Sequence, residues 1–280
     1  MRPPRFVWKR NFLPAVLVTL ALLLILSAVL EHYGFDPRPS KGPPRPHLEE
    51  VFKADDGSTG IRGEVESVIA GDSARLTSGR VVRYLGMDAP YPGQPHSWEA
   101  RELNELLVLG KEIVLEVCEK RPTDRKGRTL ARIRAEGRSV EERILERGLA
   151  VPYYDRQCDA DRRERLFSLA KQALLAGKGL WSDGERGPVA AEKAGEHLGA
   201  FLPVECRVES IRRTQKVTLL LCGSDFKAVI FSGDRRNFKK EGIDPQTAYP
   251  GRRLRLWGKI KDYNGPEIVL SGPEQVEVLE

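Results

Sequence analysis

The stretch IRGEVESVIAGDSARLTSGRVVRYLGMDAP, residues 61–90, decides the fold. It holds three short β-type runs, GEVESVI, SARL and RVVRYLGM, each of a length that suits one strand. Turn-forming residues separate the runs, with Gly71 and Asp72 in the first gap and Ser78 and Gly79 in the second. The pattern predicts a curled meander of three strands.

The chain after the meander predicts one helix and two more strands. Apolar residues recur at helical spacing over residues 97–107, on a face made by Ala100, Leu103, Leu106 and Leu107. The runs EIVLEV and TLARIRA, residues 112–117 and 129–135, predict strands, and the polar loop PTDRKGR joins them.

Two further helices are expected to complete this region. Ser139 and Glu142 form a capping-box pattern that opens one helix, and Gly148 ends it. A second helix over residues 161–176 carries an apolar stripe. Five strands with helices after the third and the fifth predict a small closed barrel with helical buttresses, a mainly β fold of the α+β class.

Composition and charge narrow the class of protein. The 280 residues are 40% hydrophobic, which excludes a mostly disordered chain and a small disulfide scaffold. The net charge of +6 is unevenly placed, because residues 1–10 carry four basic and no acidic side chains, whereas residues 61–182 and 200–280 carry +3 each. A basic total therefore does not by itself indicate nucleic acid.

Residues 11–30 predict a transmembrane anchor. Residues 12–30 hold no charge, and as a helix they would reach about 28 Å, close to the hydrocarbon thickness of a bilayer. The basic tail before them predicts a cytoplasmic N-terminus, with the domains on the extracytoplasmic side, periplasmic or extracellular. A cleaved signal peptide is the alternative, and the stretch is longer than such peptides favour and lacks a good cleavage site.

Residues 31–60 are rich in proline and charge and predict a semi-extended linker. His47 is expected to be a solvated loop residue there, since no second ligand follows at metal-binding spacing.

Five motifs carry a family resemblance over residues 61–182. VIAGDSARL, VVRYLGMDAP, DRKGRTLARI, ERGLAVPYY and KGLW stand in the order and spacing of the staphylococcal-nuclease-like (thermonuclease) family. The resemblance implies cleavage of phosphodiester bonds of DNA or RNA with bound calcium. By position it implies metal ligands at Asp72, Asp88 and the carbonyl of Ala89, and phosphate-binding arginines at Arg83 and Arg128.

The residue types suit that chemistry. Calcium prefers oxygen ligands and can acidify a water, while guanidinium groups bind phosphate oxygens bidentately. Taken singly, the aspartates would be better interpreted as turn residues and the arginines as solvated. Arg83 and Asp88 are five positions apart and would face opposite sides of a regular strand, so a strand end or bulge near Gly86 is required.

The sequence departs from the family at the general base. Tyr91 stands where the family has a glutamate, and a phenol with a pKa of about 10 is a poor base at neutral pH. Losing a general base typically lowers a rate by about 10²- to 10⁴-fold. Glu99 is a distant substitute, more simply interpreted as a surface carboxylate, and Ala70 replaces a further family acid.

Three hypotheses follow. The chain is a weak calcium-dependent nuclease, a nuclease-derived nucleic-acid binder that no longer cuts, or an anchored envelope component that grips incoming DNA. Further substrate contacts are predicted at Tyr154, by stacking on a base, and at Arg125 and Lys126, by contact with phosphate. Packing for the tyrosine and a solvated turn for the two cations are the alternatives.

Residues 183–199 predict a second linker, and residues 200–280 predict a second β-domain. Its strand order, and the hairpin GKIKDYNGPEIVL above all, resembles an OB-fold nucleic-acid-binding module. Four cations alternate along one strand, either as a binding face or as the solvent face of that strand. Trp257 and Tyr263 are available for stacking, although Trp257 is better explained as core. The four cations are Arg253, Arg255, Lys259 and Lys261.

The four cysteines have no zinc-binding spacing. Export permits disulfides, and a hairpin centred on residue 214 would place Cys206 opposite Cys222. Buried free thiols are the slightly favoured interpretation.

Overall fold

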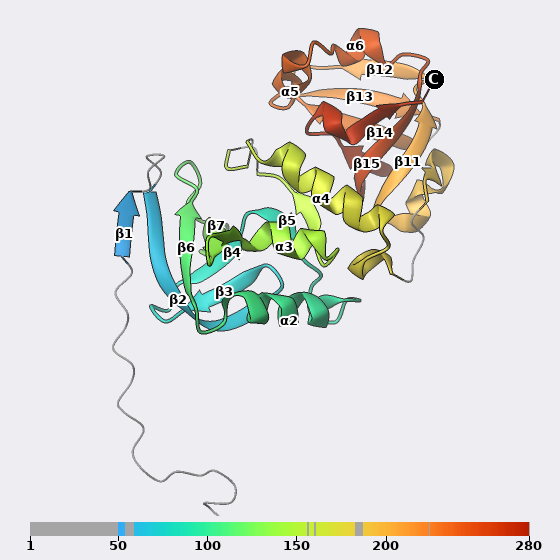
Figure 1. The fold of residues 1–280 in the computed structure, drawn as a ribbon. Helices are drawn as coiled ribbons and strands as arrows, with labels where there is room; N and C mark the ends of the chain where they lie inside the picture. The colour runs from blue at the N-terminus through green and yellow to red at the C-terminus, as the bar shows by residue number, and fades with distance from the viewer. Residues whose placement is uncertain are drawn as a thin grey trace, which may run out of the picture. The chain divides into compact units, whose positions relative to one another are not determined.

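The computed structural model describes residues 50–53, 59–155, 157–159, 161–182, 187–223 and 225–279 (Figure 1). Within these ranges no helix is long and apolar enough to cross a membrane. The predicted anchor at residues 11–30, the basic tail before it and His47 lie outside the described residues. The chain from Pro46 to Glu280 is one compact unit.

A closed five-stranded barrel forms the first half of this unit, as predicted. Neighbouring strands pair in the order β2-β3-β4-β7-β6, and β6 pairs again with β2 and closes the ring. All the pairs are antiparallel except β4 with β7. The strands are β2 (Thr59–Ala70), β3 (Ser73–Leu76), β4 (Val81–Tyr84), β6 (Glu112–Val117) and β7 (Thr129–Ala135).

Two short strands extend the barrel sheet, and two others form a separate sheet. β1 (Glu50–Lys53) pairs with β2, so part of the predicted linker at 31–60 is structured. β8 (Arg138–Ser139) pairs with β7, and β5 (Gly86–Asp88) forms a two-stranded sheet with β9 (Val151–Tyr153).

Helix α2 (Ser97–Val108) packs against β2, but its buried face differs from the predicted one. Leu106 is 71% exposed, while Asn104 is fully buried. Asn104 Oδ1 accepts a hydrogen bond from the hydroxyl of Tyr84, and its amide donates to the carbonyl of Ala70. A buried polar side chain with both partners satisfied thus replaces the predicted leucine.

The two later helices agree with prediction. In α3 (Val140–Glu146) Ser139 caps the first turn by accepting from the backbone amide of Glu142, and Gly148 follows the helix with a φ of 71°. Helix α4 (Arg163–Leu175) buries one apolar stripe, made of Leu166, Phe167, Leu169, Ala170, Ala173 and Leu174.

The second half repeats the strand connections of the first barrel. Its sheet runs β11-β15-β16-β14-β13-β12, and β14 and β16 are its parallel pair within that run. Only two residues separate β11 from β12, so one bent segment joins the two ends of the run. The strands are β11 (Phe201–Arg207), β12 (Ser210–Arg213), β13 (Val217–Cys222), β14 (Phe226–Phe231), β15 (Arg253–Asp262) and β16 (Pro266–Val269).

Smaller elements complete this half. α5 (Arg235–Lys240) and α6 (Pro245–Ala248) connect β14 to β15, and β17 (Val276–Val278) pairs with β15. Part of the predicted linker at 183–199 is ordered, because β10 (Val189–Ala190) pairs with β11 and the 3-10 helix η2 (Ala191–His197) buries Ala191 and Ala194. The remaining turns are η1 (Gly179–Trp181) and η3 (Pro273–Gln275).

Aromatic packing joins α4 to the second half. Phe167 makes edge contacts with Phe201 and with Trp257, and the indole of Trp181 donates to the carbonyl of Phe201. Trp257 is therefore a core residue, the interpretation that the sequence favoured. The ion pairs Arg163–Glu274 and Lys171–Glu277 flank this contact.

All four cysteines form disulfides, Cys118–Cys158 and Cys206–Cys222, and the preference for free thiols was wrong. The alternative pairing of Cys206 with Cys222 is confirmed, but the hairpin that would place these residues directly opposite each other was wrong. Cys206 pairs in register with Leu254 of β15, and the hairpin neighbour of β13 is β12. The second disulfide thus joins two strands that are not neighbours, because the strand bends between β11 and β12.

Candidate active site

The first aspartate of the site lies in the tight turn between β2 and β3. Asp72 is buried, and its Oδ2 accepts a hydrogen bond of 3.0 Å from the backbone amide of Ala89. Burial raises the pKa of Asp72, and the nearby guanidinium of Arg83 opposes that rise. The turn packs so closely that only glycine fits at residue 71, since a Cβ there would lie 2.7–2.8 Å from the side chains of Ala89 and Ala100.

Arg83 connects the two aspartates. Its Nη1 lies 3.0 Å from Asp72 Oδ2, and its Nη2 lies 3.0 Å from Asp88 Oδ1. The predicted strand break makes this possible, since β4 ends at Tyr84 and Gly86 takes a φ of 83°. A side chain at residue 86 would also lie 2.5 Å from Leu166, so glycine fits this break on both counts.

The second aspartate, Asp88, is the last residue of β5 and contacts two basic side chains. Asp88 Oδ1 faces Arg83, and Asp88 Oδ2 accepts a hydrogen bond of 3.1 Å from Lys259 Nζ of β15. Lys259 follows 171 residues later in the chain. The sequence singled out this lysine only as one of four alternating cations, because periodicity cannot show which distant residue it meets.

The other three alternating cations of β15 differ in their surroundings. Arg253 and Arg255 form ion pairs with Glu205, and Arg255 also pairs with Glu277, so these two charges are neutralised. Lys261 is exposed.

The loop after β6 supplies the second arginine. Arg128 Nε donates to Asp124 Oδ2 at 2.7 Å, and the backbone amides of Lys126 and Arg128 donate to Asp124 Oδ1. These bonds lower the pKa of Asp124, although its partial burial acts in the opposite direction. Asp124 thus fixes the loop, a role that sequence reasoning missed although the Asx-turn pattern of DRKG is its signal.

A cavity of about 340 Å³ brings most of the predicted residues together. Its polar lining includes both arginines, the second aspartate, the loop cations and Tyr91, while Asp72 and Ala89 are buried and do not line it. The predicted site residues that line this cavity are Arg83, Asp88, Tyr91, Arg125, Lys126 and Arg128.

Tyr153, the last residue of β9, and Tyr154, which follows it, differ in exposure. Tyr153 is 52% exposed and lines the cavity, whereas the hydroxyl of Tyr154 is buried without a hydrogen-bond partner. Burial raises the pKa of Tyr154 well above its usual value. The ring of Tyr153 is therefore more accessible for stacking on a nucleobase than the ring of Tyr154, the residue that the sequence predicted.

Tyr91 occupies the rim of the cavity. Its side chain is 64% exposed, and its backbone amide donates to Gln94 Oε1. Glu99, the distant substitute for a base, pairs with His96 on the first turn of α2 and does not line the cavity.

The donor atoms fit a hard cation only in part. Asp72, Asp88 and a backbone carbonyl are oxygen ligands of the kind that calcium takes, but calcium usually takes six to eight. In the described ranges no three His, Cys, Asp or Glu side chains gather as a metal group. Both carboxylates already face cations, so a metal ion would share them with Arg83 and Lys259.

Residues 81–183 match the family model described as staphylococcal nuclease homologue. "Probable staphylococcal-like nuclease CAN1" of Oryza sativa subsp. japonica is 35% identical over 101 residues, 36% of this chain and 28% of that protein. "Uncharacterized 38.1 kDa protein" of Capnoides sempervirens is 33% identical over 101 residues, with the same coverage.

The chain therefore contains a staphylococcal-nuclease-like domain. The matched segment begins with β4 and includes Asp88 and Arg128, whereas Asp72 precedes it. The match spans 28% of each of these two relatives.

Proposed function

We propose that the protein binds nucleic acid in this cavity and hydrolyses its phosphodiester bonds weakly, with calcium as cofactor. The observation that carries the proposal is the bridge from Arg83 to Asp72 and Asp88 beside Arg128. Two guanidinium groups on one cavity suit a phosphate, and two adjacent carboxylates suit a divalent cation.

The chain's own residues would bind and orient the substrate. Arg128 is held through Nε by Asp124, which leaves its terminal nitrogens as donors for phosphate oxygens. Arg83 is fixed on both sides by carboxylates and supplies positive charge where the transition state gains negative charge. Calcium, held by Asp72, Asp88 and the carbonyl of Ala89, would supply an acidified water.

The position of Tyr91 limits the rate. Its phenol is a poor base, so the hydrolysis we propose lacks the proton acceptor that a glutamate would provide. This residue is also the observation that favours the second candidate function, a nucleic-acid-binding protein without turnover.

A cleavage assay on the full-length protein separates the two functions. Wild type, Tyr91→Glu and Asp88→Ala are incubated with calcium and single-stranded DNA. Cleavage by wild type above Asp88→Ala supports hydrolysis, and a further gain of about 10²-fold or more in Tyr91→Glu supports the missing base as its limit. Cleavage that Asp88→Ala retains in full would contradict the assigned site.

We further propose that residues 11–30 anchor the protein in a membrane and that the domains lie outside the cytoplasm. The uncharged stretch supports the anchor, and two disulfides support an oxidising compartment. Carbonate extraction of membranes from the native host tests the anchor, since an anchored chain stays in the pellet and an unanchored chain is released.

A further inference from the structure

A second cavity lies beside the candidate active site. It measures about 500 Å³ and is lined from both halves of the compact unit. Four residues, Asp88, Arg121, Tyr153 and Asp155, line this cavity and the active-site cavity alike. The two cavities therefore meet along these residues.

Strand β15 contributes lysines to the second cavity. Lys259 and Lys261 are two positions apart on this strand, so both side chains lie on one of its faces. Each acidic group of the cavity has its own cation, because Asp155 pairs with Arg121, Glu267 with Lys227, and Asp88 with Arg83 as well as Lys259. Lys261 has no ion-pair partner among the described residues.

The charge balance at Asp88 depends on Lys259. Asp72 and Asp88 carry two negative charges, and Arg83 supplies only one positive charge. The ammonium of Lys259, 3.1 Å from Asp88 Oδ2, supplies the second. Without it the group formed by Asp72, Asp88 and Arg83 would hold one excess negative charge, which locally repels a phosphate and attracts a cation.

We propose that Lys259 is a phosphate-binding residue of the candidate active site, supplied by the second half of the chain. In the free protein Asp88 holds its ammonium at the site. A bound nucleic-acid strand places a phosphate beside Lys259 and continues along the second cavity past Lys261. This inference rests on the proposed binding of nucleic acid, but it does not require that the protein cleaves it.

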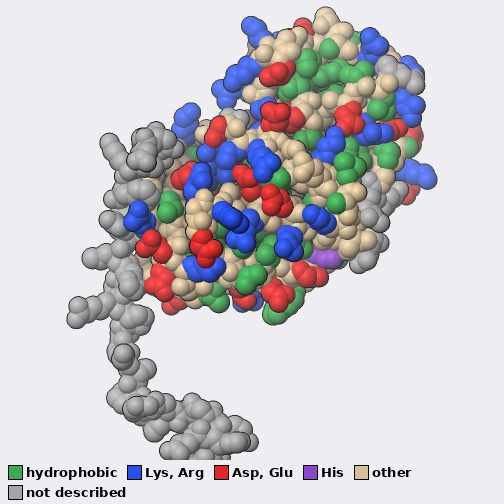
Figure 2. Space-filling model, in the orientation of Figure 1, with side chains coloured by type: hydrophobic (Ala, Val, Ile, Leu, Met, Phe, Trp, Pro, Cys, Tyr) green, Lys and Arg blue, Asp and Glu red, His purple; other side chains and the backbone are tan. Residues whose placement is uncertain are grey.

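The visible face of the molecule is not a general basic surface. Figure 2 shows basic and acidic side chains interspersed over the visible face, without a continuous basic area. Non-specific attraction to this face would therefore contribute little to binding, and single lysines in the cavities gain importance.

The test measures binding of a fluorescent single-stranded DNA to the full-length protein in EDTA, over a series of salt concentrations. Lys259→Gln is expected to weaken binding about five- to tenfold at 50 mM salt and to reduce the slope of log K against log salt by about 0.7. Lys259→Arg keeps the charge and should retain most of the affinity. Lys240→Gln, which removes one exposed charge from α5 outside both cavities, is the matched control.

A second readout follows from the same charge balance. Because Lys259→Gln frees Asp88 Oδ2, calcium measured alone by calorimetry should bind this variant more tightly than wild type. Thermal unfolding of each variant shows that the fold is intact.

The outcomes are separable. Equal DNA affinity and equal salt slope for wild type and Lys259→Gln would overturn the inference, as would equal losses in Lys259→Gln and Lys240→Gln. A wild type that binds no DNA would overturn it too. If the wild type binds DNA normally but shows no calcium-dependent cleavage, only the proposed hydrolysis fails. The role of Lys259 is then still supported by the binding measurements.

Discussion

Asp72 holds the chain at Ala89 by accepting its backbone amide, with an N–O distance of 3.0 Å. The turn between β2 and β3 is thereby fastened to the residue that follows Asp88. A buried carboxylate thus has a structural partner as well as a proposed role toward metal.

Substitutions at Asp72 separate these two roles. Asp72→Asn keeps an oxygen that can accept from Ala89, whereas Asp72→Ala leaves that buried amide unpaired and should lower the free energy of unfolding by about 1–3 kcal/mol more than Asn does. Both variants should lose calcium-dependent cleavage. Denaturant unfolding measures the difference, and equal losses of stability in the two variants would show that the bond to Ala89 contributes nothing.

Glu141 gives the fold a pH dependence. Its carboxylate is fully buried and accepts hydrogen bonds of 2.7 Å from the amide of Ile133 and from the hydroxyl of Ser139. Burial raises its pKa above the ordinary 4.5, although Arg162 acts in the opposite direction. The folded state therefore holds the proton more tightly than the unfolded state.

Because the pKa of Glu141 is higher in the folded than in the unfolded state, its contribution to stability falls as the pH rises. The stabilisation from Glu141 is complete below about pH 4.5 and is lost as the pH rises through the folded pKa. The free energy of unfolding of Glu141→Gln, measured from pH 4 to 8, should lack this decline, so wild type should lose stability relative to the variant as the pH rises. A difference between the two proteins that is constant with pH would contradict the assignment.

Much of the first barrel could be predicted from local sequence. Alternating strand runs and turn residues depend on neighbours in the chain. The break at Gly86 followed from the five-residue spacing of Arg83 and Asp88, once the family resemblance had assigned both residues to one site. The buried face of α2 was predicted incorrectly, because apolar periodicity favours burial of Leu106 over burial of Asn104. Only the fold brings Tyr84 and Ala70 to Asn104 and makes its burial favourable.

The contacts between distant segments could not be predicted. Lys259 meets Asp88 across 171 residues, and Cys118 meets Cys158 across 40, and neither pairing leaves a trace in spacing. The pairing of Cys206 with Cys222 could be named from the sequence, but its geometry was wrong, because one strand was expected where the chain bends from β11 into β12.

Gly148 and Gly179 pack backbone to backbone and join the motifs ERGLA and KGLW. A Cβ on Gly179 would lie 2.4 Å from the carbonyl oxygen of Gly148, which also accepts the amide of Leu180 at 2.9 Å. Gly179→Ala should lower the free energy of unfolding by roughly 2–4 kcal/mol, through a clash and a φ of 51°. Gly110→Ala is the matched control, since Gly110 has a φ of 65° and no atom near a Cβ, and should cost only about 1–2 kcal/mol. Equal losses would exclude the clash.

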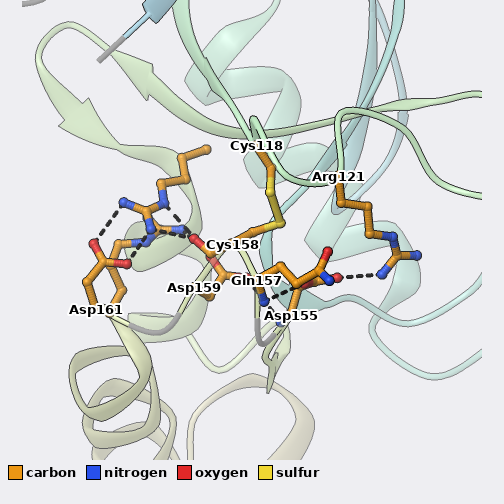
Figure 3. The surroundings of a disulfide bond; sticks show 9 residues. Cys118, Arg121, Asp155, Gln157, Cys158, Asp159 and Asp161 are labelled. Atoms are coloured by element: carbon orange, nitrogen blue, oxygen red, sulfur yellow. Dashed lines mark hydrogen bonds and ion pairs between the residues drawn. A yellow bond between two sulfur atoms is a disulfide. The ribbon is translucent and has the colours of Figure 1, made fainter. Parts of the chain in front are cut away.

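The Cys118–Cys158 disulfide joins the segment after β6 to the segment before α4 and borders the candidate active site. Figure 3 shows it between the Arg121–Asp155 ion pair and the carboxylates of Asp159 and Asp161. Arg121 and Asp155 line both cavities, so the disulfide fixes part of the shared rim.

Removing each disulfide by paired Cys→Ala substitutions tests this role. Loss of Cys118–Cys158 should lower the free energy of unfolding by roughly 2–5 kcal/mol, about 0.8 kcal/mol more than loss of Cys206–Cys222, because its loop is 40 rather than 16 residues long. It should also weaken binding of single-stranded DNA, since the rim loosens. Arg121 and Asp155 lie three residues from Cys118 and Cys158, whereas no described residue within three positions of Cys206 or Cys222 lines either cavity, so loss of the second disulfide should leave DNA affinity unchanged in the folded protein. Equal effects of the two substitutions on DNA affinity would show that the first disulfide acts only on global stability.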